Sequence, residues 1–179
     1  DGFEPVNQVQ IDRTKAALNY ISSVIDLQFV QTNDPAQPNT LRFANNSQDK
    51  SAAYAMYPSS SFRGSDVFLN KNVAGNLRIA DGSYASLTLI HEIGHALGLK
   101  HPFKTGGIDD HPDEPPYLDE VEDVTTWTVM SYTTYPAQYQ LTFSPLDIAA
   151  LQYLNGPSPL ARHMSPSAPA RTPRPKEQA

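Results

Sequence analysis

Residues 91–101 read HEIGHALGLKH, and this stretch decides both the fold class and the chemistry of the chain. His91 and His95 are four residues apart, so on a helix they lie on the same face and both imidazoles can reach one ion. Glu92 lies about 100° further round such a helix, where it can reach a water held by the ion. Gly98 permits a sharp turn out of the helix, which brings His101 round as a third nitrogen ligand.

Three nitrogen ligands without any cysteine favour zinc. Three protein ligands also leave one coordination position for water, which is typical of catalytic and not of structural zinc sites. We therefore predict a zinc site formed by His91, His95 and His101, with Glu92 as the general base of a hydrolytic reaction. Ordinary helix histidines are a poor alternative, because three of the five histidines in the chain fall in this one pattern.

Apolar periodicity and turn residues predict a domain that mixes helices with short strands. Helices are expected over residues 12–25, with Asp12 as the N-cap, and over residues 86–97 and 145–154. Strands are expected over residues 27–31, 40–45, 53–57 and 66–70. Residues 102–126 are rich in Gly, Pro and Asp and predict a loop.

The end of the chain differs in composition from the rest. Residues 1–157 predict a single domain, and residues 158–179 a Pro-rich basic tail or linker that cannot build a core. The tail carries four basic side chains against one acidic one, so the domain is more acidic than the net charge of −6. An acidic domain repels phosphates, so nucleic acid is not an expected partner. A second hypothesis for the tail is that part of residues 160–179 borders the substrate groove.

A second motif follows about thirty residues later, where residues 127–132 read WTVMSY. Alone, Met130 would be a core methionine and Tyr132 an aromatic packing residue. After an extended zinc motif, the stretch instead indicates a Met-turn, an apolar floor beneath the histidines that orients them.

With these motifs the chain resembles the metzincin metallopeptidases, and among them the serralysins. Pro102 follows the third histidine, as in serralysins, whereas astacins place Glu there and adamalysins Asp. Matrixins lack a Tyr two residues after the Met, and this chain has Tyr132. Further similarity lies in residues 53–58, 64–70, 122–123 and 147–156.

The resemblance implies an α+β metzincin catalytic domain. Its expected parts are a twisted, mostly parallel sheet with an antiparallel edge strand, an active-site helix, the Met-turn and a C-terminal helix. Serralysins also carry a strand before the first helix and continue into a calcium-binding β-roll, and we expect neither in this chain. Whether the chain is part of a longer protein is left open.

The resemblance also implies a function, zinc-dependent hydrolysis of peptide bonds in protein or peptide substrates by a secreted, extracellular monomer. Tyr132 is then both a reversible metal ligand and a catalytic residue that donates a hydrogen bond to the oxyanion. Substrate is expected to lie extended along residues 53–57. Two alternatives remain, a catalytically silent binding or adhesion module and a latent protease whose zinc site is occupied.

Acidic residues gather between the two motifs and offer oxygen ligands for calcium. Their spacing fits no known calcium loop, so a solvated acidic loop is the preferred interpretation and calcium the alternative. No apolar run is long enough to cross a bilayer, so no membrane partner is expected. The acidic residues are Asp109, Asp110, Asp113, Glu114, Asp119, Glu120, Glu122 and Asp123.

Overall fold

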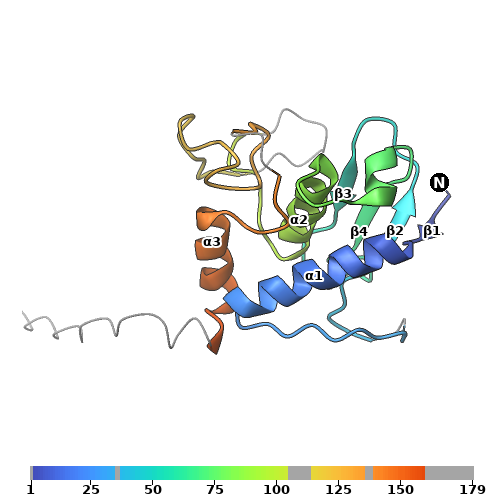
Figure 1. Ribbon diagram of the computed structural model, residues 1–179. Helices are drawn as coiled ribbons and strands as arrows, with labels where there is room; N and C mark the ends of the chain where they lie inside the picture. The colour runs from blue at the N-terminus through green and yellow to red at the C-terminus, as the bar shows by residue number, and fades with distance from the viewer. Residues whose placement is uncertain (1, 35–36, 105–113, 136–138, 160–179) are drawn as a thin grey trace, which may run out of the picture.

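The structure is a computed structural model that describes residues 2–34, 37–104, 114–135 and 139–159. Figure 1 shows a sheet on one side of the active-site helix α2 and helix α3 on the other, with α1 running beneath both. The elements in chain order are β1 (Glu4–Pro5), α1 (Gln8–Val24), β2 (Phe43–Asn46), β3 (Ala53–Ala55), β4 (Val67–Asn70), the 3-10 helix η1 (Ala74–Arg78), α2 (Tyr84–Ala96) and α3 (Pro145–Asn155). None of the described helices is long and apolar enough to span a membrane.

The sheet has the strand order β1-β2-β4-β3. β2 and β4 run parallel at its centre, whereas β1 and β3 pair antiparallel at the two edges. The expected α+β metzincin architecture with an antiparallel edge strand is confirmed, and β3 is that edge strand. The expectation that no strand precedes the first helix is wrong, because residues Glu4 and Pro5 pair with Asn45 and Ala44 of β2.

The predicted strand at residues 27–31 is also wrong, since this segment forms no strand in the structure. Leu27 and Phe29 are half-buried and pack on the core. The alternation of apolar and polar residues therefore reflects one-sided burial of the segment, which pairs with no strand among the described residues.

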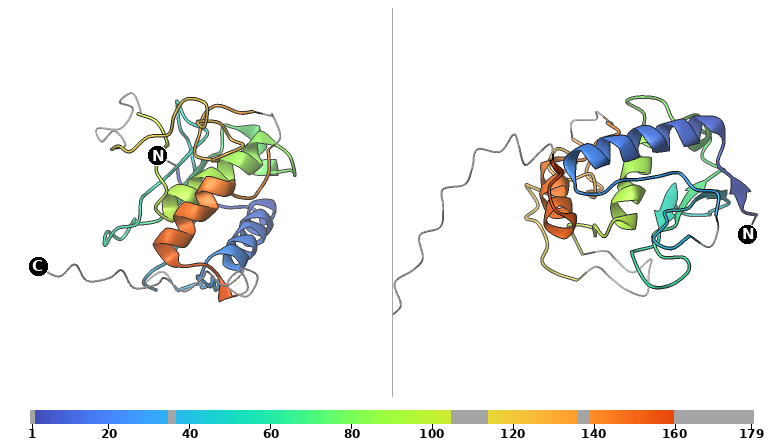
Figure 2. Two further views of the ribbon diagram at one scale, coloured as in Figure 1. Left: turned by 90° about the vertical axis from the view of Figure 1, so that its left-hand side faces the viewer. Right: turned by 90° about the horizontal axis from the view of Figure 1, so that it is seen from below.

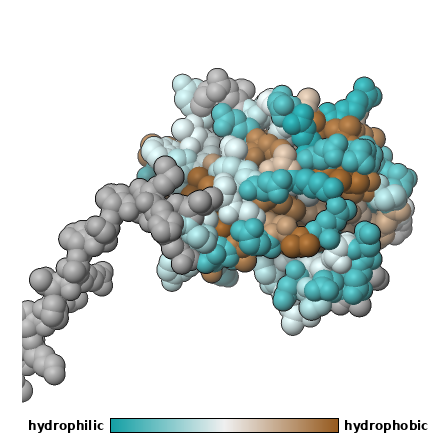
Figure 3. Space-filling view, turned by 60° about the horizontal axis from the view of Figure 1, so that its bottom comes forward, coloured by the Kyte–Doolittle hydropathy of each residue, from teal (hydrophilic) through white to brown (hydrophobic). Residues whose placement is uncertain are grey.

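Helix α1 begins four residues earlier than the predicted start at Asp12. Asn7 is its N-cap and forms a capping box with Gln10, in which each side chain accepts a hydrogen bond from the other residue's backbone N–H. The buried face of α1 is formed by Gln10, Thr14, Ala17 and Ile21, at helical spacing. The opposite face of α1 carries polar residues, and Figure 3 views the molecule with this side turned forward, where hydrophilic side chains alternate with hydrophobic ones.

Helix α2 is buried from Ala85 to Ala96, because the sheet, η1 and the core pack around it. Ser83 is its N-cap and accepts a hydrogen bond from the Ser86 N–H. Leu89, Ile90 and Ile93 are completely buried. The motif residues on α2 therefore belong to a well-packed helix.

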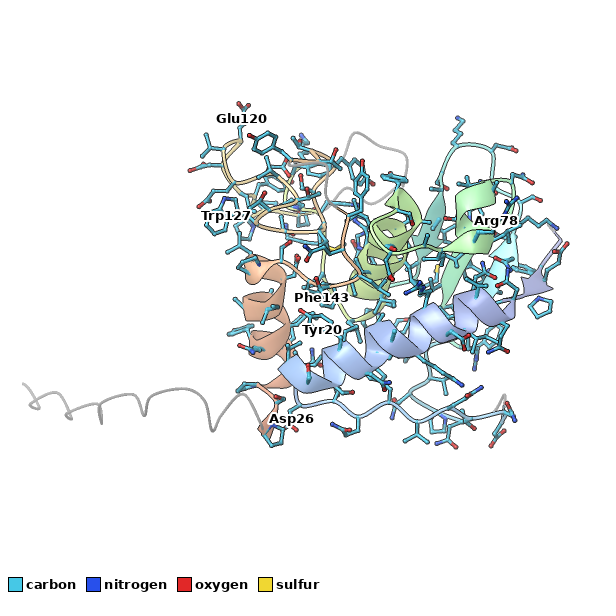
Figure 4. All side chains as sticks on the ribbon, in the orientation of Figure 1. Tyr20, Asp26, Arg78, Glu120, Trp127 and Phe143 are labelled. Atoms are coloured by element: carbon cyan, nitrogen blue, oxygen red, sulfur yellow. The ribbon has the colours of Figure 1, made fainter. Side chains whose placement is uncertain are left out.

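Helix α3 closes the domain against the end of α1 (Figure 2). The Gln152 amide donates to the Val24 carbonyl at 2.9 Å, and the Ser158 hydroxyl donates to the Ser23 carbonyl at 2.6 Å. Tyr20 of α1 hydrogen-bonds the backbone of Phe143, and Figure 4 shows the two residues between α1, α2 and α3. Residues 143–158 are thus tied to α1.

Candidate active site

Three imidazole nitrogens converge at the C-terminal end of α2. The Nε2 atom of His95 lies 3.1 Å from Nε2 of His91 and 3.2 Å from Nε2 of His101. His101 reaches this place because Gly98, at φ +103°, ends the helix in a left-handed conformation that favours glycine. The predicted ligand set is therefore brought together, and within the described residues it is the one group of this kind that could hold a metal ion.

Hydrogen bonds on the other side of two rings decide which nitrogens are protonated. His91 Nδ1 lies 2.8 Å from the Val129 carbonyl, and His95 Nδ1 lies 2.8 Å from the Leu99 carbonyl. A carbonyl only accepts, so each Nδ1 must carry the proton and donate it. In the neutral rings both Nε2 atoms then carry lone pairs, and the two atoms lie only 3.1 Å apart.

Lone pairs at this distance repel each other unless a cation lies between them. Burial lowers the pKa of His91 to about 4 and that of His95 well below its usual value, so both rings are neutral at physiological pH. Zinc bonds of about 2.1 Å in a tetrahedral arrangement would separate the nitrogens by about 3.4 Å. The donor set therefore fits zinc, as the sequence predicts.

Glu92 lies on the same buried helix, beside the first histidine. It is 7 % exposed, and burial raises the pKa of its carboxyl to about 8. A carboxyl with a pKa raised this far, next to a candidate metal site, is typical of a catalytic acid or base. The predicted position of Glu92 at the site is consistent with the helix geometry.

The turn that carries Met130 lies against α2. Met130 is 1 % exposed, and a Cβ added at Gly94 would lie 2.7 Å from its Sδ atom. The helix and the turn therefore contact each other at Gly94, the motif residue that has no side chain. Asp147 of α3 secures the turn, because its carboxylate accepts hydrogen bonds from the Thr128 hydroxyl at 2.6 Å and the Val129 N–H at 2.8 Å.

Tyr132 lies at the mouth of the site with 67 % of its surface exposed. Its ring centroid is 4.9 Å from that of His101 and 5.8 Å from that of His91. The structure therefore places this predicted site residue beside the histidines.

Sequence reasoning missed two aromatic neighbours of the ligands. Tyr57 meets His95 edge-on with ring centroids 5.4 Å apart, and Phe103 stacks on His101 at 5.2 Å. Phe103 follows the third histidine by two residues, and this proximity was the signal available in the sequence. Tyr57 ends the range 53–57 that was predicted to receive substrate, but its contact with His95 was not foreseen from the sequence.

Two cavities meet helix α2 at Leu87, and one of them reaches the first histidine. The larger, of about 290 Å³, is lined by residues that include Leu87 of α2, Val129 and Phe143. The smaller, of about 90 Å³, also contacts Leu87 and reaches His91 and Tyr132. Edge strand β3 packs against the same helix. The candidate site thus has a strand edge and cavities close to it.

Other expected features fall partly outside the described residues. Asp109, Asp110 and Asp113 of the acidic segment lie there, and Glu114, Asp119, Glu120, Glu122 and Asp123 belong to no group that could hold a metal within the described part. The hypothesis that residues 160–179 border the groove also concerns residues outside the description. Pro157 and Ser158 are described, and they pair with Ile25 and Val24 at the end of α1.

Comparisons with known proteins agree with this geometry. Residues 4–108 match the matrixin family model, which is more than half of the chain. Serralysin G of Dickeya chrysanthemi is 33% identical over 169 residues, which is 87% of this chain and 35% of that protein. Serralysin of Proteus mirabilis is 40% identical over 124 residues, which is 62% of this chain and 25% of that protein.

The chain spans about a third or less of the length of these curated relatives. The matched span of the matrixin model ends before Tyr132, so the helix and its histidines are within it and the turn of Met130 is not. The family match, the similar proteins and the three convergent histidines all indicate a zinc metallopeptidase domain. The chain belongs to the family of zinc metallopeptidases that the matrixin model describes, and within it is a serralysin-like metzincin.

Proposed function

We propose that this chain hydrolyses peptide bonds within extended protein substrates, with His91, His95 and His101 as zinc ligands and Glu92 as the general base. The convergence of three Nε2 atoms, two of them on rings whose Nδ1–H groups face backbone carbonyls, carries the proposal. When zinc is bound there, it lowers the pKa of its water and polarises the substrate carbonyl.

Glu92 takes a proton from the attacking water and later passes it to the leaving amine. The burial that raises its pKa to about 8 favours proton uptake. A cation beside the carboxylate lowers the pKa again, so that the group is ionised and able to accept the proton at neutral pH. One carboxyl group can therefore serve as base and then as acid.

Tyr132 is assigned two roles, as a reversible ligand and as donor of a hydrogen bond to the oxyanion of the tetrahedral intermediate. Its exposure and its closeness to two of the histidine rings support this assignment. The turn of Met130 is assigned as the Met-turn, and its burial against Gly94 supports that interpretation.

Substrate is proposed to add to the outer edge of β3 as a further strand. This mode supplies main-chain hydrogen bonds and little sequence specificity, so broad proteolysis is expected. The larger cavity, lined in part by Leu87 and Val129, has room for one substrate side chain. We further propose, from the resemblance to serralysins, that the protein acts as a monomer outside the cell and that any calcium is bound separately from the zinc site.

Hydrolysis of casein by the full chain tests the proposal. Activity should be present after zinc loading, disappear with a chelator and return when zinc is added back. Glu92→Gln should lower the rate by roughly a hundred- to ten-thousandfold, because the base is lost while its shape is kept. The zinc content should be unchanged in this variant.

Two outcomes would contradict the proposal. A folded, zinc-loaded chain that cleaves neither casein nor short peptides would favour a binding or adhesion module. Cleavage that begins only after the chain is truncated behind Gly156 would favour a latent protease. The retained Glu92 favours the active enzyme, since losing that residue is the simplest way to silence such a site.

A further inference from the structure

Three aromatic rings form a triangle at the mouth of the site. Phe103 stacks on His101 with centroids 5.2 Å apart and planes 30° apart, and it meets Tyr132 at 5.0 Å and 60°. His101 and Tyr132 complete the triangle at 4.9 Å and 68°. All three separations fall in the range in which aromatic pairs attract each other.

Phe103 has a different position in this group from the other two rings. His101 is a candidate ligand, and Tyr132 is assigned to bind the metal and release it again. Phe103 contacts the Tyr132 ring and is not itself a candidate ligand. It can therefore support Tyr132 without occupying a coordination position.

The backbone beside Phe103 is held in place by contacts with the segment 116–118. Pro102 is buried, and its carbonyl accepts a hydrogen bond from the Leu118 N–H at 2.8 Å. On the same side Lys100 donates to the Pro116 carbonyl at 2.8 Å and lies over the Tyr117 ring. Residues 100–103 are thus held by the segment 116–118, which keeps the Phe103 ring on His101.

We propose that Phe103 is a positioning residue that holds the phenol ring of Tyr132 beside the metal site and stacks on His101. This inference rests on the proposed role of Tyr132. The Phe103 ring packs against the Tyr132 ring with centroids 5.0 Å apart, and this contact limits the rotamers open to a phenol that is 67 % exposed. The phenolic oxygen is then already placed when the oxyanion forms.

The experiment replaces the Phe103 ring and tests whether the resulting change in activity depends on the Tyr132 hydroxyl. Phe103→Leu and Phe103→Met both keep apolar bulk without an aromatic face, and Phe103→Trp keeps a face. Each is made in the full zinc-loaded chain, alone and together with Tyr132→Phe. Phe3→Leu is the matched control, because Phe3 also forms an aromatic pair, with Phe68, beside the far edge of the sheet.

A second measurement does not depend on activity. Cu²⁺ binds nitrogen ligands more tightly than Zn²⁺, so it can replace zinc at the site. A phenolate bound to Cu²⁺ gives a charge-transfer absorption in the visible range, which reports directly on Tyr132. Tyr132→Phe provides the baseline without this band.

We expect Phe103→Leu and Phe103→Met to lower kcat about three- to tenfold with KM nearly unchanged, as loss of an aromatic pair predicts. The copper band should weaken in both variants and persist in Phe103→Trp and Phe3→Leu. In the Tyr132→Phe background the same substitutions should have no further effect. Zinc content, measured on every variant, should stay at one ion per chain.

Several results would overturn the inference. Wild-type kcat and copper band in both ring-less variants would show that Phe103 does not position Tyr132. An equal loss of kcat in the Tyr132→Phe background would assign Phe103 a separate packing role, and a change in KM alone would make it a substrate contact. If Tyr132→Phe itself left kcat and the copper band unchanged, Tyr132 would have no catalytic role and the inference would be wrong. Loss of hydrolysis in Glu92→Gln would still support the proposed function in that case.

Discussion

The carboxylate of Asp147 accepts a hydrogen bond from the backbone N–H of Val129 at 2.8 Å, and this contact joins α3 to the candidate metal site. The carbonyl of the same Val129 accepts the Nδ1–H of His91 at 2.8 Å. Asp147 also accepts hydrogen bonds from the Thr128 hydroxyl and the Ser144 N–H. One buried carboxyl thus secures the helix start, the turn and, through Val129, the orientation of the first histidine.

Asp147→Ala should lower the free energy of unfolding by about 3 kcal/mol, because the buried Val129 N–H and the partly buried Ser144 N–H lose their acceptor. Asp147→Asn should lower it by only about 1 kcal/mol, since an amide oxygen can still accept from Val129 and Ser144 while the amide N–H donates to Thr128. Urea unfolding of both variants checks the order. Asp81→Ala, which removes an exposed ion pair with Arg13, is the control and should change little.

Gly94→Ala should destabilise the protein by about 1–3 kcal/mol, because the new Cβ would lie 2.7 Å from the buried Met130 sulfur and 3.4 Å from Phe143. Gly75→Ala is the matched control, since its Cβ would lie 3.7 Å from Ala85, which is ordinary contact. We expect the control to match or slightly exceed the wild type in thermal unfolding. Equal unfolding temperatures of the two variants would show that the turn of Met130 can shift to accommodate the new Cβ without loss of stability.

Glu92→Gln should change how the stability of the zinc-free protein depends on pH. Glu92 has a folded-state pKa of about 8 against an ordinary 4.5, so between these values the folded state holds more of its proton than the unfolded state. The stabilising contribution is complete below pH 4.5 and is lost as pH rises through 8, by up to about 1.4 kcal/mol per pH unit. Glutamine does not titrate.

Urea unfolding after chelator treatment, at pH 5, 6.5 and 8, measures this difference. The free energy of unfolding of the variant, relative to that of the wild type, should rise at each step in pH. The contributions of the histidines cancel in this comparison because both proteins contain them. Parallel stability curves would mean that Glu92 is ionised without cost in the folded state.

His95→Gln should reduce zinc affinity by more than about a hundredfold, which exceeds the usual loss when only a supporting partner of a ligand is removed. His95 is the central ligand, since its Nε2 lies within 3.2 Å of the other two. Equilibrium dialysis with elemental analysis gives the affinity. His111→Gln, outside the motif, should bind zinc normally, and a similar loss there would reassign the ligand set.

The sequence by itself determined the helix of the motif, the three candidate ligands and the glycine stop, because these depend on spacing within eleven consecutive residues. Helical geometry places i and i+4 on one face wherever the helix lies. Strands β2, β3 and β4 were likewise predicted near their observed places from alternating side chains between turn residues. The start of α1 was misplaced, because its capping box from Asn7 to Gln10 precedes the apolar periodicity that was used to find it.

Only the tertiary structure decided which groups support the site. Val129, 38 residues from His91, and Asp147, 18 residues further on, meet through chain returns that no local pattern specifies. The triangle of His101, Phe103 and Tyr132 likewise needs the segment after α2 to fold back beside the turn of Met130. Local spacing sets which atoms can bind the metal and also pairs His95 with the Leu99 carbonyl. Long-range packing sets the proton on His91 and the places of Tyr57 and Tyr132, because those depend on contacts between distant segments.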